Sequence, residues 1–166
     1  RPKSSAASDV YKRQFYSRMS DKISRAKRFD DYMPFTEMST NIVDEPYQAN
    51  YQNVYYKGAL INMCLDIIIR EQSGGKRGFL NVMQTLAKKY GVDTPFTDNK
   101  LFDEIISMTY PEVGAFIETY IQGETPVPYK SYLERAGVTI SETDKKLQSI
   151  IMLSLIHISE PTRRKR

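Results

Sequence analysis

The chain has 166 residues, with 24 basic and 20 acidic side chains and a formal net charge of +4. It contains one cysteine, Cys64, which excludes an internal disulfide framework. No run of residues approaches the roughly 18 apolar positions that a membrane-spanning helix needs. The composition therefore predicts a domain with a core of its own and no membrane span.

Both ends of the chain read as translated DNA adapter. Residues 4–14, SSAASDVYKRQ, match the translation of a transposon adapter used in sequencing libraries, and residues 153–163, LSLIHISEPTR, match the reverse complement of its partner adapter. Processing scars are set aside before a fold is considered. We therefore treat residues 1–14 and 153–166 as adapter artefact, and residues 15–152 as a natural stretch of a longer protein.

Setting the ends aside reverses the sign of the charge. The ends carry eight basic and two acidic residues, which leaves 16 basic and 18 acidic residues between them. A net charge of −2 gives no indication of a nucleic-acid partner. The single histidine, His157, also lies in one of the ends.

The natural stretch reads as helices joined by short loops, without the alternation that is typical of strands. The first expected elements are an exposed helix over residues 15–29 and a short segment over residues 35–43. Residues 44–51, with Pro46, read as a loop. Apolar side chains then cover most of the circumference of a helix over residues 52–72, which predicts a buried helix.

Later helices are marked by their ends. Ser73-Gly74-Gly75 closes the buried helix, since glycine is favoured just past a C-terminus. Residues 78–90 read as an amphipathic helix whose inward residues are Phe79, Leu80, Val82, Met83 and Leu86. Thr97 or Asp98 is expected to cap a helix that runs to about Thr109. Pro111 is expected in the first turn of the next helix, which ends at Gly123. A last short helix is expected over residues 128–136.

No catalytic or metal-binding constellation is present in the natural stretch. Residues 15–152 contain no histidine, no Cys-x-x-Cys pair and no phosphate-binding loop. Gly74-Gly75-Lys76 follows a helix and reads as a turn. Cys64 lies among apolar residues in mid-helix, which indicates a core position. We expect no metal ligand in this chain.

Four motifs, taken together, resemble the glycyl aminopeptidase family of zinc metallopeptidases. They are residues 50–70, NYQNVYYKGALINMCLDIIIR; residues 35–39, FTEMS; residues 73–83, SGGKRGFLNVM; and residues 128–137, PYKSYLERAG. Gly78, Phe79 and Asn81 depart from the family pattern. The resemblance implies an all-α, helical C-terminal subdomain of a thermolysin-like catalytic region over residues 15–138, in incomplete form. It makes residues 139–152 a candidate start of a PDZ-like domain.

In that family, a tyrosine two positions before a Lys-Gly pair directs its phenol at the tetrahedral intermediate. The resemblance places this role on Tyr55, with Tyr56 as the alternative if the alignment shifts by one residue. A phenol is protonated at neutral pH and can donate to an oxyanion. We expect Gly58 to allow close backbone packing and Lys57 to be a solvated or locally paired charge. Asp66 and Arg70, four residues apart, are expected to pair.

The leading interpretation is a fragment of a zinc-dependent metallo-aminopeptidase, which hydrolyses peptide bonds at the N-termini of peptide substrates. The fragment would supply the transition-state tyrosine but not the zinc ligands, which in the family lie upstream on a His-Glu-x-x-His helix. We expect zinc in the parent protein, none bound by this fragment, and no activity from the fragment alone. The alternatives are a non-enzymatic helical interaction module and a fragment of the larger alanyl/leukotriene-hydrolase aminopeptidases, which share the Tyr-x-Lys-Gly-Ala run.

Overall fold

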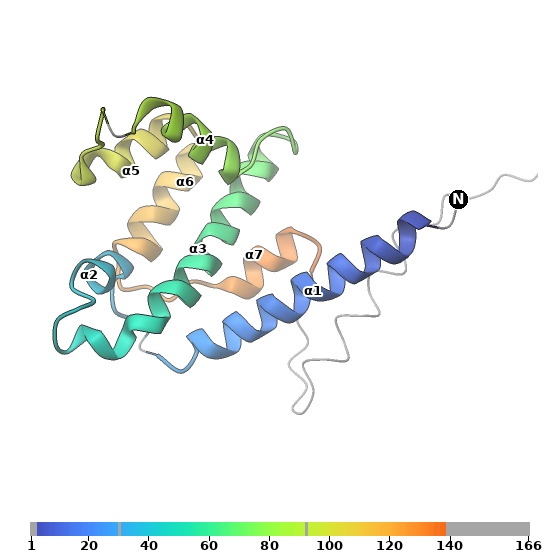
Figure 1. Ribbon diagram of the computed structural model, residues 1–166, viewed down its shortest axis with the longest axis horizontal. Coiled ribbons are helices and arrows are strands. Elements are labelled where there is room, and N and C mark those ends of the chain that lie inside the picture. The colour runs from blue at the N-terminus through green and yellow to red at the C-terminus, as the bar shows by residue number, and fades with distance from the viewer. Residues whose placement is uncertain (1–2, 30, 92, 139–166) are drawn as a thin grey trace, which may run out of the picture. The chain divides into compact units, whose positions relative to one another are not determined.

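The computed structural model describes residues 3–29, 31–91 and 93–138, and these form helices and connecting turns (Figure 1). No strand occurs in these three ranges, which confirms the all-α class. Within them, no helix is both long and apolar enough to cross a membrane. The expected PDZ-like start at residues 139–152 and the C-terminal adapter stretch at 153–166 lie outside the described residues.

The elements follow the expected order. The α-helices are α1 (Lys3–Ala26), α2 (Phe35–Thr40), α3 (Tyr51–Gln72), α4 (Phe79–Lys89), α5 (Asp98–Ser107), α6 (Pro111–Phe116) and α7 (Tyr129–Arg135). A 3₁₀-helix, η1 (Tyr47–Asn50), precedes α3, and a π-helical turn, η2 (Ile117–Ile121), extends α6. Two compact units divide the chain: Lys22–Tyr129 is one, and Arg1–Asp21 with Lys130–Arg166 is the other.

Two boundaries differ from the sequence prediction. The first helix was expected to begin at residue 15, but α1 begins at Lys3. Neither proline nor glycine occurs between Lys3 and Ala26, so nothing in this stretch interrupts a helix. Residues 44–51 were expected to form a loop, but Tyr47–Asn50 form the 3₁₀-helix η1. Pro46 precedes η1, so its missing N–H and fixed φ do not interrupt the helical turn.

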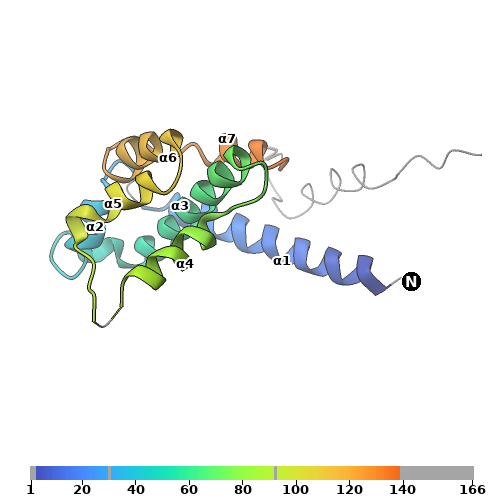
Figure 2. The ribbon, with the colours of Figure 1, turned by 90° about the horizontal axis from the view of Figure 1, so that it is seen from above.

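Helix α3 is the central element of the Lys22–Tyr129 unit. It contacts η1, α2, α4 and α6, and both ribbon views show α4 and α6 beside it (Figures 1 and 2). Thr97 precedes the first residue of α5, although its side chain makes no capping hydrogen bond. Pro111 lies in the first turn of α6, as predicted. The buried apolar side chains of this unit are Ala26, Met38, Leu60, Ile61, Cys64, Leu65, Ile68, Ile69, Val82, Leu86, Ile105, Val113, Phe116, Ile117, Ile121 and Val127. The expected burial of the 52–72 helix is therefore confirmed for one side of α3, whereas Tyr55 and Asn62 leave another side exposed.

Helix α4 buries a narrower face than its sequence suggested. Val82 and Leu86 are buried, whereas Leu80 is 66% exposed and Met83 is 46% exposed, so the prediction that Leu80 and Met83 point inward is wrong. Residues 79, 82 and 86 share one side of a helix, and residue 80 leaves the helix on the opposite side. Helix α4 packs on α3, and Leu80 and Met83 lie outside the buried part of this contact.

The end of α4 is tied to α5 by a small charged cluster. The Tyr90 hydroxyl donates a hydrogen bond to one carboxylate oxygen of Glu104, and the Lys89 ammonium lies 3.1 Å from the other. The Lys89 ammonium also lies 5.1 Å from the centre of the Tyr90 ring. The bond from Tyr90, followed by that from Lys89, holds the pKa of Glu104 below its ordinary value of 4.5.

This cluster predicts a pH dependence of stability. A carboxylate with a lowered folded pKa contributes stability that is present above its unfolded pKa and lost as the pH falls through the folded pKa. Glu104→Gln should therefore lower the free energy of unfolding at neutral pH and have little effect below the folded pKa, as measured by urea denaturation across the acid range. Glu118→Gln, at an exposed carboxylate, is the matched control. An identical acid dependence in the two variants would contradict the prediction.

Candidate functional site

Tyr55 lies in the second turn of α3 and projects into solvent. Its side chain is 63% exposed, and its ring lies 5.7 Å, between centres, from that of Tyr51 one turn earlier. The two hydroxyl oxygens are 3.4 Å apart. This hydrogen bond is the main cause of a raised pKa for Tyr55, above its ordinary 10.0. The phenol therefore keeps its proton at neutral pH and is able to donate it in a hydrogen bond.

Tyr56 occupies a different environment from its neighbour. The Arg25 guanidinium donates to the Tyr56 hydroxyl at 3.3 Å, and its central carbon lies 5.6 Å from the centre of the ring. The Lys22 ammonium lies 5.7 Å from the same ring centre. A cation near the face of an aromatic ring is attracted by the ring quadrupole. The two adjacent tyrosines are thus distinguishable: Tyr56 is engaged by the end of α1, and Tyr55 projects away from the core.

Lys57 is one of the most buried side chains in the described part of the chain. It is 1% exposed, and its ammonium lies 3.2 Å from the Asp31 carboxylate and donates to the Asp31 backbone oxygen at 3.1 Å. The expectation of a solvated or locally paired charge is therefore wrong. The partner is 26 residues away, on the segment between α1 and α2, and a buried ammonium needs such a partner to offset its desolvation.

Gly58 lets α2 approach α3. A methyl group added at Gly58 would lie 3.3 Å from the Cζ atom of Phe35, which is tighter than ordinary packing. The sequence predicted close packing at this glycine, and the structure identifies the ring of Phe35, in α2, as the neighbour. Residues 56, 57 and 58 thus each contact a different segment, while residue 55 remains exposed.

Two further buried polar groups were missed from the sequence. Asn53 is 1% exposed, and its amide donates only to the Met38 sulfur, at 3.8 Å, so its side-chain oxygen has no hydrogen-bond partner among the described residues. The Tyr129 hydroxyl also lacks one there, and its burial raises its pKa. Asn53 lies four residues before Lys57 on the side of α3 that carries Leu60 and Cys64. That spacing was a readable signal of burial.

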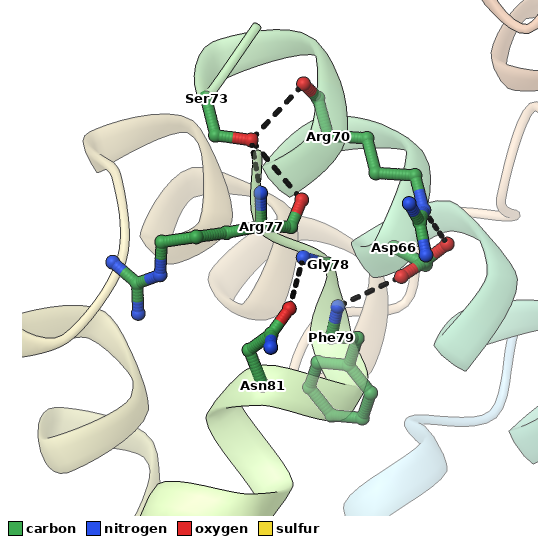
Figure 3. Close-up of polar contacts among 7 residues, drawn as sticks. All are labelled: Asp66, Arg70, Ser73, Arg77, Gly78, Phe79 and Asn81. Carbon is green, nitrogen blue, oxygen red and sulfur yellow. Dashed lines mark hydrogen bonds and ion pairs between the residues drawn. The ribbon is translucent and has the colours of Figure 1, made fainter. Parts of the chain in front are cut away.

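Asp66 joins α3 to the start of α4 (Figure 3). The expected pair with Arg70 is confirmed, with 2.6 Å between Arg70 Nε and one carboxylate oxygen of Asp66. The other oxygen accepts a hydrogen bond from the Phe79 backbone N–H at 2.8 Å, and the Gly78 N–H donates to the Asn81 side chain at 2.8 Å. The first N–H groups of a helix have no partners within it, so these two side chains satisfy donors at the start of α4.

The loop between these helices is the turn that its sequence indicates. Gly74 and Gly75 have φ values of 60° and 80°, in the left-handed region that glycine favours. The Ser73 hydroxyl accepts from the Arg77 N–H at 3.0 Å, and Lys76 is exposed. Cys64 is fully buried in the core, as expected.

The described residues do not form a metal site. Among them, no group of three or more His, Cys, Asp or Glu side chains is placed to hold a metal ion. Comparison of the chain with models of protein families, with curated proteins and with solved structures finds no match. Functional inference therefore depends on the tyrosine-bearing part of α3 and on the resemblance of its motifs.

The hydroxyl pair predicts a measurable change at Tyr55. Tyr51→Phe keeps the ring contact but removes the hydrogen bond, so the pKa of Tyr55 should fall toward 10.0. The measurement is an NMR titration of the protein with ring-labelled tyrosine. Tyr56→Phe removes a hydroxyl that bonds to Arg25 and not to Tyr55, so it should leave the titration of Tyr55 unchanged. Equal titration of Tyr55 in the wild type and in Tyr51→Phe would contradict the assigned bond.

The junction of α3 and α4 predicts a steric effect at Gly78. A methyl group there would overlap the Asp66 carboxylate and lie 2.9 Å from Arg70 Nη2, so Gly78→Ala must displace the group that caps α4. We expect a loss of about 1–3 kcal/mol in the free energy of unfolding, measured with urea. Gly91→Ala is the control, because no atom lies within 4 Å of its added methyl. Equal stability of the two variants would refute the steric argument.

Proposed function

We propose that this chain is the helical part of a zinc-dependent metallo-aminopeptidase of the glycyl aminopeptidase type. The observation that carries the proposal is the exposed phenol of Tyr55, on a helix whose opposite side, with Asn53 and Lys57, is buried. It lies in the Tyr-x-Lys-Gly run, whose Lys57 and Gly58 are held by Asp31 and Phe35. A rigid support beneath an exposed donor is the arrangement that a transition-state hydrogen bond needs.

The proposed role of Tyr55 is to donate a hydrogen bond to the oxygen that gains charge during peptide hydrolysis. A phenol keeps its proton at neutral pH, so its O–H is available to donate at the pH of the reaction. The substrate would be the N-terminal residue of a peptide. Tyr56 is less suited to the role, because its side chain is less exposed than that of Tyr55 and its hydroxyl is in contact with Arg25.

The described residues do not themselves fit a zinc site, because no suitable group of ligands occurs among them. In the proposed enzyme the zinc ligands and the general base would come from residues outside this chain. Tyr55 would then face the cleft that those residues form. The chain alone would accordingly bind no catalytic zinc.

A second candidate is a helical module that binds another protein. Its supporting observation is the set of large apolar and aromatic side chains on the surface of the Lys22–Tyr129 unit: Tyr32, Val43, Tyr51, Tyr55, Leu80, Met83 and Phe96. Tyrosine and methionine are enriched at protein interfaces. The peptidase requires a His-Glu-x-x-His helix before Tyr55 in the complete gene, whereas the interaction module does not.

The test is to recover the natural reading frame, express the longer protein and measure hydrolysis of aminoacyl anilides. We expect a His-Glu-x-x-His helix before Tyr55 and zinc-dependent activity. Tyr55→Phe should lower kcat by about 10²–10³ with little change in KM, since a donor that acts only on the transition state is lost. Tyr56→Phe should retain most of the activity.

Several outcomes would contradict the proposal. Without a metal-binding helix in the full frame, the interaction module becomes the better account. A Gly-x-Met-Glu-Asn substrate loop upstream would instead favour the larger alanyl/leukotriene-hydrolase aminopeptidases. A strong kcat loss in Tyr56→Phe but not in Tyr55→Phe would transfer the role to Tyr56.

A further inference from the structure

The buried ammonium of Lys57 is the least expected group in the core of the Lys22–Tyr129 unit. Burying a charge is costly, and an apolar residue of similar length would fill the same space without that cost. The charge is met by two oxygens of one residue, the carboxylate and the backbone carbonyl of Asp31. A buried ion pair of this kind can contribute more to a defined arrangement than to stability.

An apolar side chain and an ammonium constrain a helix differently. Apolar contacts are non-directional, so a helix held by them alone can rotate slightly with little loss. The Lys57 ammonium lies 3.2 Å from the Asp31 carboxylate, and a rotation large enough to separate the two would leave it buried without a partner. The ion pair of Lys57 with Asp31 therefore defines the rotation of the first turns of α3 about the helix axis.

The same rotation determines where Tyr55 projects. Residues 55 and 57 are two positions apart, which is about 200° around a helix, so their side chains leave α3 on opposite sides. Their exposures agree with this geometry: 1% for Lys57 and 63% for Tyr55. Between them, Tyr56 contacts Arg25, and one residue further Gly58 contacts Phe35.

We propose that Lys57 is a positioning residue for Tyr55, which directs the phenol by anchoring the opposite side of the helix to Asp31. This proposal rests on the proposed function only where it gives the Tyr55 phenol a catalytic role. The positioning itself is a property of the chain described here. It requires the helix to lose its defined rotation, rather than its fold, when the charge is removed.

The experiment compares Lys57→Met with wild type in the full chain. Nuclear Overhauser effects (NOEs) between the Gly58 and Phe35 protons, and between the Tyr56 ring and Lys22 or Arg25, report the rotation of this part of α3. We expect Lys57→Met to lose them while its helical circular dichroism is retained and its melting temperature shifts by no more than a few degrees. Exchange protection of the Phe79 amide, held by Asp66, should persist because it reports the other end of α3.

Matched variants separate positioning from stability. Lys57→Arg keeps a cation at this position and should retain the NOEs. Lys89→Met makes the same substitution at a half-exposed ion pair and should leave the NOEs intact. If Lys57→Met does not fold, the double variant Lys57→Met with Asp31→Asn leaves no charge unpaired and should fold without these NOEs. Full retention of the NOEs in Lys57→Met, or in the double variant, would overturn the proposal.

The two proposals fail in different ways. If the longer protein proves not to be a peptidase, the NOEs still decide whether Lys57 sets the direction of Tyr55. If the longer protein is an active peptidase but the NOEs survive removal of the charge, only the positioning role is lost.

Discussion

The burial of α3 is the constraint to which the rest of the Lys22–Tyr129 unit responds. Its fully buried leucines and isoleucines are each worth about 1.5–3 kcal/mol relative to exposure, so the helix must be covered. Helices α2, α4 and α6 supply that cover. Polar residues of α3 then need partners from the covering segments, which Lys57 finds in Asp31 and Asp66 finds in the Phe79 amide. One exposed strip, carrying Tyr51 and Tyr55, is left for chemistry or recognition.

Helix positions could be predicted because their signals are local. The left-handed turn at Gly74 and Gly75 and the first-turn Pro111 each depend on the conformational preference of a single residue type. The Asp66–Arg70 pair needed only a spacing of four on one helix. Such features can be predicted without knowing which helices pack against one another.

Side-chain environments that depend on distant segments could not be predicted in the same way. Lys57 looks like a surface lysine until Asp31 is placed beside it, and nothing in the sequence near residue 57 identifies that partner. Leu80 and Met83 fit an inward face of α4, yet the contact of α4 with α3 leaves both side chains exposed. At the candidate site, the motif pointed to Tyr55 with Tyr56 as the alternative. The different surroundings of the two side chains become visible only from the contact of Tyr56 with Arg25.

The start of α4 has a consequence for how this unit assembles. At the position where many helices carry a serine or aspartate of their own, α4 has Gly78, and the carboxylate that receives the Phe79 amide belongs to α3. A peptide spanning α4 alone would lack that acceptor, and glycine adds backbone freedom that opposes initiation. Formation of α4 is therefore conditional on α3 being in place, which couples the two helices into one cooperative folding unit.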